Sequence, residues 1–143
     1  GGNIYKYCLP LCVISPSSIM IHKDIFKDVG LFDENFPVCE DYDLWLRICS
    51  RYPVVYLREK LIKKFGGHDD QLSRRYWGMD RFRIQALEKM INDPVLTEND
   101  RMATVTTAIN KAKILQKGLV KHSHKEEAEK MTKKLAELET LYD

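Results

Sequence analysis

The sequence lacks the features of several common classes of protein. No apolar run approaches the roughly 20 residues of a membrane-spanning helix and no signal peptide is visible, so we expect a cytoplasmic chain without a membrane span. The formal net charge is only +2, which gives no reason to expect nucleic acid as a partner. Four cysteines are few for a disulfide scaffold and show no zinc-ribbon spacing, so we expect buried free thiols.

Familiar catalytic motifs are also missing. The chain has no Gly-rich phosphate loop, no nucleophile elbow and no cysteine–histidine pair at a useful spacing. These absences disfavour P-loop, serine-hydrolase and cysteine-protease chemistry. What is present is 44% hydrophobic content in 143 residues, enough for a domain with a real core.

The most informative stretch is Val38–Arg47, which places three acids within four residues and follows them with an apolar run. Acids at the front of an apolar-periodic segment are typical of the first turn of a helix, where the helix dipole favours negative charge. We therefore expect a helix from about Glu40 to Arg51. It should end at Tyr52-Pro53, because the residue before proline avoids helical angles.

Within this helix, Asp41 is the best-placed candidate for a general base. Successive helical residues are about 100° apart, so Asp41 and Asp43 point roughly 200° apart and cannot both face one metal. Asp43 is expected to pair with Arg47 as a surface contact. Asp41 sits one turn before Trp45, and partly apolar surroundings would make it a better proton acceptor. The alternative is that the acids only cap the helix.

A second candidate is His68, in the polar loop Gly66–Gln71. The two glycines before it let the backbone bend sharply and present the side chain to a metal or a phosphate. The alternative is an ordinary exposed loop histidine. His122 and His124 flank a serine in a basic stretch, and we expect both to face solvent.

The pattern of apolar residues divides the chain into residues 1–72 and residues 73–143. The first part shows short β-prone runs near Ser18–His22 and Val54–Phe65 and a helix that stops at Gly30. The second part has a helical period of 3.6. We therefore predict an α+β chain, predominantly helical, in which the acidic helix packs on a small β element.

Three helices are predicted in the second part. The first runs from Ser73 to about Asn92, the second from Thr97 to about Lys117 where Gly118 stops it, and the third from Ser123 to the C-terminus. The last two should form an antiparallel hairpin. The first of these helices carries an aromatic stripe that we expect to face the core: Tyr76, Trp77 and Phe82.

Four signals in order make a resemblance recognisable. Ser17–Ile21, Gly30–Glu34, Cys39–Arg47 and Gly66–Ser73 together resemble the second half of a family-two glycosyltransferase of the GT-A fold. The resemblance covers about residues 10 to 90.

The resemblance implies a role for each candidate residue. Asp41 would be the general base, with Glu40 its neighbour in the acidic pair, in the transfer of a sugar with inversion from a nucleotide-sugar donor to a hydroxyl of a sugar or glycan acceptor. His68 would lie near a divalent metal, Mg²⁺ or Mn²⁺, and the diphosphate. In the isolated chain no bound metal is expected, because one histidine without a carboxylate partner is a poor site.

The chain also departs from that family. Nothing before Ser15 is long enough to be a nucleotide-binding half, so we expect a C-terminal fragment that is inactive alone. Its uncovered apolar face should be hidden by self-association or by its own tail. The competing hypothesis is a non-enzymatic helical module, in which the C-terminal hairpin binds another protein.

Overall fold

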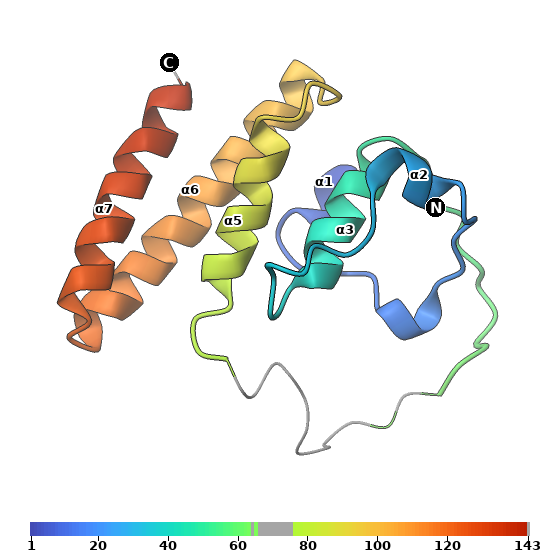
Figure 1. The fold of residues 1–143 in the computed structure, drawn as a ribbon, viewed down its shortest axis with the longest axis horizontal. Coiled ribbons are helices and arrows are strands. Elements are labelled where there is room, and N and C mark those ends of the chain that lie inside the picture. The colour runs from blue at the N-terminus through green and yellow to red at the C-terminus, as the bar shows by residue number, and fades with distance from the viewer. Residues whose placement is uncertain (64, 66–75, 143) are drawn as a thin grey trace. The chain divides into compact units, whose positions relative to one another are not determined.

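Figure 1 shows the computed structural model, which describes residues 1–63, 65 and 76–142. The chain divides into two compact units, Gly1–Met79 and Asp80–Asp143. The described part is predominantly helical, as predicted. Its helices are α1 (Tyr5–Cys8), η1 (Pro16–Ser18), α2 (Ile25–Val29), α3 (Glu40–Cys49), α5 (Asp80–Ile91), α6 (Glu98–Lys121), α7 (Lys125–Glu139) and η2 (Thr140–Tyr142).

The first unit is built around α3, against which both α1 and α2 pack. Glu40 begins this helix as predicted, and it ends at Cys49, two residues earlier than Arg51. Most of its side chains are buried, which makes it the core of the unit rather than a surface helix. The buried residues of α3 are Tyr42, Asp43, Leu44, Trp45, Leu46, Ile48 and Cys49.

The helix predicted to stop at Gly30 is α2, and the prediction is confirmed. Gly30 follows the last helical residue, Val29, with φ of 80°. Glycine adopts this left-handed value without the clash that a Cβ would cause. The turn places Val29 against Leu44, Trp45 and Ile48 in one apolar cluster.

The predicted strand at Ser18–His22 is wrong. Its first residue closes the 3-10 helix η1, Ile19 is extended, and residues 19–22 form no strand or bridge among the described residues. The period-two pattern has another cause. Ile19 and Ile21 pack on the apolar cluster around α3, while Met20 is 99% exposed. Alternating exposure of successive side chains shows that one side of the segment is buried. A β-strand also requires a second strand to which its backbone can hydrogen-bond.

The predicted strands within Val54–Phe65 are also wrong over the residues that the structure describes. Val54 forms one isolated antiparallel bridge with Gly2, and residues 55–63 form no ladder. The apolar residues that follow Val54 are exposed. A high β-propensity does not make a strand where the backbone has no neighbouring strand and the side chains have no surface to pack against. The exposed apolar residues are Val55, Tyr56, Leu57, Leu61 and Ile62. Accordingly α3 packs on helices and loops, and the predicted β element is absent from the described residues.

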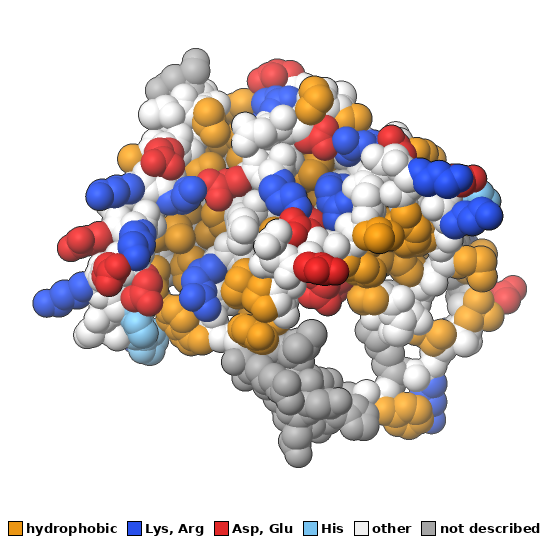
Figure 2. All heavy atoms as spheres, in the orientation of Figure 1, with side chains coloured by type: hydrophobic (Ala, Val, Ile, Leu, Met, Phe, Trp, Pro, Cys, Tyr) orange, Lys and Arg blue, Asp and Glu red, His pale blue; other side chains and the backbone are white. Residues whose placement is uncertain are grey.

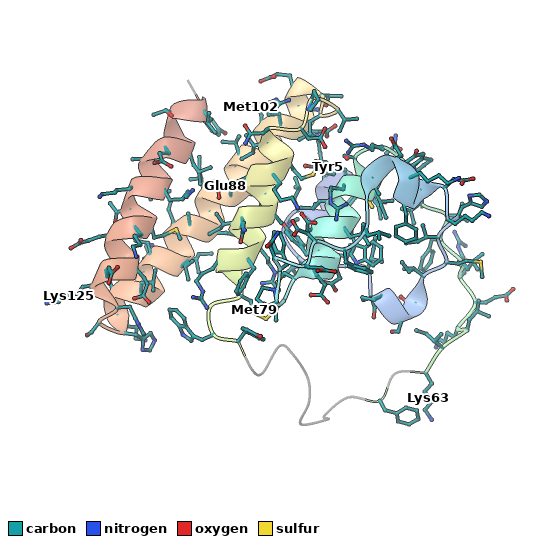
Figure 3. All side chains as sticks on the ribbon, in the orientation of Figure 1. Tyr5, Lys63, Met79, Glu88, Met102 and Lys125 are labelled. Atoms are coloured by element: carbon teal, nitrogen blue, oxygen red, sulfur yellow. The ribbon has the colours of Figure 1, made fainter. Side chains whose placement is uncertain are left out.

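The described residues of the second unit form three α-helices, as predicted, with α5 and α7 both packed against α6, and end in the short 3-10 helix η2. The α6–α7 pair is the predicted helical hairpin. Glu88 projects from α5 (Figure 3) and accepts a hydrogen bond from Lys134 of α7 at 2.7 Å, which ties the outer helices together. On the face of this unit that Figure 2 shows, acidic and basic side chains are interspersed.

The first of these helices begins later than predicted. Helix α5 starts at Asp80, and the described residues immediately before it, 76–79, are not helical. Gly78 lies among them with φ of 65°, a value outside the right-handed helix. The prediction of an aromatic core is wrong for Tyr76 and Trp77, which are 37% and 46% exposed, whereas Phe82 on α5 is half-buried.

Two predicted helix boundaries near the hairpin are wrong. Helix α6 continues through Gly118 to Lys121, and the added turn buries Leu119 to 1% exposure. Ser123 does not cap α7. It has φ of 62° and belongs to the end of α6, where its N–H donates to Val120 O and the N–H of His124 donates to Leu119 O. This pair of bonds is the Schellman arrangement that closes helices with a left-handed residue.

In the part of the chain that the structure describes, no helix combines sufficient length and apolar character to cross a bilayer.

Candidate functional site

The acidic pair lies at the point where the chain enters α3. Cys39, the residue before the helix, has φ of 62° and ψ of 19°, a left-handed conformation that non-glycine residues adopt rarely. This bend keeps Val38 and Cys39 buried and places Glu40 and Asp41 in the first turn, both half-buried. The first turn of a helix favours carboxylates because its free N–H groups carry partial positive charge.

Asp41 is held by one donor on each carboxylate oxygen. The backbone N–H of Tyr42 donates to Oδ1 at 2.7 Å, and the thiol of Cys12 donates to Oδ2 at 3.3 Å. An ionised carboxylate offers about four acceptor positions, so these two bonds leave capacity to accept a further proton donor. The arrangement fits a positioned proton acceptor.

The contact with Asp41 also affects the pKa of the Cys12 thiol. Burial and the adjacent negative charge of Asp41 together raise the pKa of Cys12 from 9.0 to about 12. The thiol therefore stays protonated at physiological pH and acts as a donor. It is a poor nucleophile for the same reason.

Asp43 has a different role from the one predicted. It pairs with Arg47 as expected, but the pair is not a surface contact, because the side chains of Asp43 and Arg47 are 1% and 14% exposed. Arg47 also donates to the carbonyl oxygens of Val29 and Leu31, the latter at 2.9 Å. Asp43 and Arg47 thus fix the end of α2 on α3, while Asp41 contacts the segment around Cys12.

Two aromatic residues of α3 hold that segment, Leu9–Ile14, against the helix. The Tyr42 hydroxyl donates to Leu9 O at 2.5 Å, and the Trp45 Nε1–H donates to Ile14 O at 3.0 Å. Cys12 lies between these two anchors. Its position beside Asp41 therefore follows from bonds made by other residues.

His68 lies outside the described residues. Among those that are described, no group of three His, Cys, Asp or Glu side chains is placed to hold a metal ion. The described residues therefore do not form a site for a divalent metal by themselves.

The remaining histidines of the second unit are ordinary surface groups, as predicted. His122 and His124 are exposed, and His124 lies 3.5 Å from Glu127 of the same helix. The same unit has a surface hollow of about 370 Å³ between α6 and the C-terminal end of the hairpin, crossed by the Lys113–Glu139 ion pair.

Sequence reasoning missed Cys12 and the burial of Asp43. Cys12 was treated only as a buried thiol, and it lies 29 residues from Asp41 in the sequence. No local pattern joins two residues so far apart. For Asp43 a signal was available, because Leu44, Leu46 and Ile48 surround Trp45 with apolar residues on every side of the helix.

Comparison with known proteins gives a family for this region. The profile described as "Glycosyltransferase like family 2" matches residues 9–90, which contain α3 and its neighbours. Among curated proteins, an uncharacterized glycosyltransferase of Rickettsia felis is 33% identical over 69 residues, covering 47% of this chain and 11% of the relative. One of Rickettsia typhi is 36% identical over 59 residues, covering 41% of this chain and 18% of the relative.

The matched part is therefore a small share of the length of those relatives. No solved structure matches the chain significantly.

Proposed function

Because the chain belongs to the glycosyltransferase-like family 2, we propose that the protein carrying it transfers a sugar from a nucleotide-sugar donor to an acceptor hydroxyl, with Asp41 as general base. The observation that carries this proposal is the setting of Asp41. Its carboxylate is half-buried in the first turn of α3, is held by one donor on each oxygen and lies inside the matched region. A base held in this way needs little reorganisation when the acceptor arrives.

The proposed reaction is a single displacement. The acceptor oxygen forms a bond to the anomeric carbon while the bond from that carbon to the nucleotide's phosphate oxygen breaks. Asp41 accepts the hydroxyl proton, and the nucleoside diphosphate leaves with the bonding electron pair. Attack opposite the leaving group inverts the anomeric carbon.

The partners proposed are a nucleotide-sugar donor and a sugar or glycan acceptor. A divalent metal, Mg²⁺ or Mn²⁺, with His68 near it, belongs to the same proposal, because anionic diphosphates are commonly bound through such ions. We propose that the 143-residue chain alone does not turn over, because the curated relatives are several times longer than the segment they share with it.

The test is the Asp41→Asn variant of the full-length protein. Nucleoside diphosphate release is measured with a panel of UDP-, GDP- and dTDP-sugars, and donor affinity is measured separately. We expect turnover to fall by about 10²–10⁴-fold with donor affinity nearly unchanged, because asparagine keeps the size of the side chain but cannot accept the proton.

The matched control is Asp24→Asn, which neutralises an exposed carboxylate of the same unit that pairs with its chain neighbours His22 and Lys27. Its turnover should equal that of the wild type. Equal turnover of Asp41→Asn and the wild type would mean that the acids serve the helix and not the chemistry.

A further inference from the structure

We propose that Cys12 is a positioning residue for Asp41: its S–H donates to Oδ2 and fixes the orientation of the carboxylate for proton transfer. The inference rests on the proposed function of Asp41 as general base. Cys12 itself does not touch substrate in this proposal. It acts through the carboxylate.

The geometry gives the thiol a defined task. The terminal torsion angle of an aspartate side chain has a broad distribution. A carboxylate held at only one oxygen can therefore rotate away from the orientation that proton transfer requires. Here the Tyr42 N–H at 2.7 Å fixes Oδ1 and the Cys12 thiol at 3.3 Å fixes Oδ2. With both oxygens engaged, the remaining lone pairs keep one direction.

A second acceptor competes for the thiol proton. Ile14 O lies 3.4 Å from Cys12 Sγ, slightly farther than Asp41 Oδ2. A hydrogen bond to an ionised acceptor is about twice as strong as one to a neutral carbonyl, so the carboxylate is the preferred partner. The high pKa of Cys12 keeps the proton on sulfur throughout the working range of an enzyme.

The buried ion pair of α3 supplies a matched control. Asp43 bonds to Arg47, whose guanidinium group reaches the carbonyl oxygens of Val29 and Leu31 at the end of α2. Neutralising Asp43 should destabilise the first unit and leave the thiol–carboxylate bond in place. A purely structural role of Cys12 would give the same phenotype as this change.

The contact is tested first without any enzyme assay. The 143-residue chain and its Asp41→Asn variant are alkylated with iodoacetamide at pH ~9, where the thiolate fraction controls the rate, and Cys12 and Cys49 are followed by peptide mass spectrometry. We expect Cys12 to react at least about threefold faster in the variant. Neutralising Asp41 removes a negative charge that disfavours the thiolate, so the pKa of Cys12 falls and the thiolate fraction rises. Cys49 should react at an unchanged rate. An unchanged alkylation rate of Cys12, or an equal increase in the rate of Cys49, would show that the Cys12 thiol does not contact the Asp41 carboxylate.

The kinetic test uses the full-length protein with Cys12→Ala, Cys12→Ser and Asp43→Asn. We expect Cys12→Ala to lower kcat about tenfold with the KM for the nucleotide sugar within about twofold, since misaimed groups lose rate and not binding. Cys12→Ser restores the donor and should recover kcat to within about threefold of wild type. Asp43→Asn should lower the free energy of unfolding and leave kcat near the wild-type value.

Equal losses of kcat in Cys12→Ala and Asp43→Asn, or no recovery in Cys12→Ser, would contradict the positioning role. Failure of the proposed function is recognised separately. In that case Asp41→Asn turns over normally, while the alkylation rates still report whether Cys12 contacts Asp41.

Discussion

Two guanidinium nitrogens of Arg47 donate to the same carboxylate oxygen of Asp43, from Nε at 3.0 Å and from Nη2 at 2.8 Å. The pair is one helical turn apart on α3 and lies inside the first unit. Through the same guanidinium group, Arg47 reaches the carbonyl oxygens at the end of α2. This ion pair therefore joins two helices, which a surface pair between adjacent turns does not do.

The first prediction concerns this ion pair. Asp43→Asn should lower the free energy of unfolding by about 3 kcal/mol, because it leaves the charge of Arg47 poorly compensated in a largely buried place. Urea unfolding of the 143-residue chain followed by far-UV circular dichroism measures the loss. Asp24→Asn, which removes an exposed ion pair with Lys27, should cost less than about 1 kcal/mol. Similar small losses in both variants would show that the buried pair does not hold α2.

The second prediction concerns Gly118 in α6. A Cβ added there meets no atom within 4 Å, and the residue lies inside a regular helix. Gly118→Ala should raise the free energy of unfolding by about 1 kcal/mol, the difference in helix propensity between alanine and glycine. Gly30→Ala is the contrasting variant. Because Gly30 has φ of 80°, alanine there should destabilise the protein. Thermal unfolding of both variants decides the sign at each position.

The third prediction concerns the start of α6. The Thr97 hydroxyl accepts the N–H of Asp100 at 3.1 Å and donates to the Asp100 carboxylate at 2.8 Å. Thr97→Ala should therefore cost about 1 kcal/mol of unfolding free energy, the usual value for a lost N-cap. Thr97→Ser keeps the oxygen and should retain most of that stability. A serine variant as unstable as the alanine variant would assign the effect to the threonine methyl group and not to the cap.

The fourth prediction concerns alkaline pH. Cys12 ionises near pH 9.0 in the unfolded chain, whereas its pKa in the folded chain is raised to about 12. Above pH 9.0 the unfolded state therefore binds fewer protons at this site than the folded state, and the stability contributed by Cys12 falls as the pH rises toward 12. Cys49 acts in the same direction, because its hydrogen bond with Cys8 and its burial raise its pKa.

The measurement is the urea midpoint as a function of pH from neutral to strongly alkaline. Wild type should lose stability with increasing pH, and Cys12→Ser, which carries no ionising group, should lose it less steeply. Parallel slopes for the two proteins would mean that the Cys12 thiol is not protected from ionisation in the folded state.

The amino-acid sequence by itself determined the features that depend on neighbours within one helical turn. The acids at Glu40 and Asp41 predicted the start of α3, Gly30 predicted the end of α2, and Thr97 predicted the cap of α6. In each case the deciding interaction joins residues no more than four positions apart, through the helix dipole, a left-handed glycine or a capping bond. Local chemistry of this kind is visible before any tertiary contact exists.

Only the tertiary structure decided how the extended segments are used and which groups surround the acids. Residues around Ile19 and Val54 have the composition of strands, but a ladder requires a partner strand, which the described chain does not bring to them. Cys12 meets Asp41, 29 residues away in the sequence, because Tyr42 and Trp45 fasten to α3 the segment Leu9–Ile14 that contains Cys12. The burial of Asp43 likewise depends on where α2 packs. Such contacts depend on the path of the whole chain, and no short-range pattern encodes them.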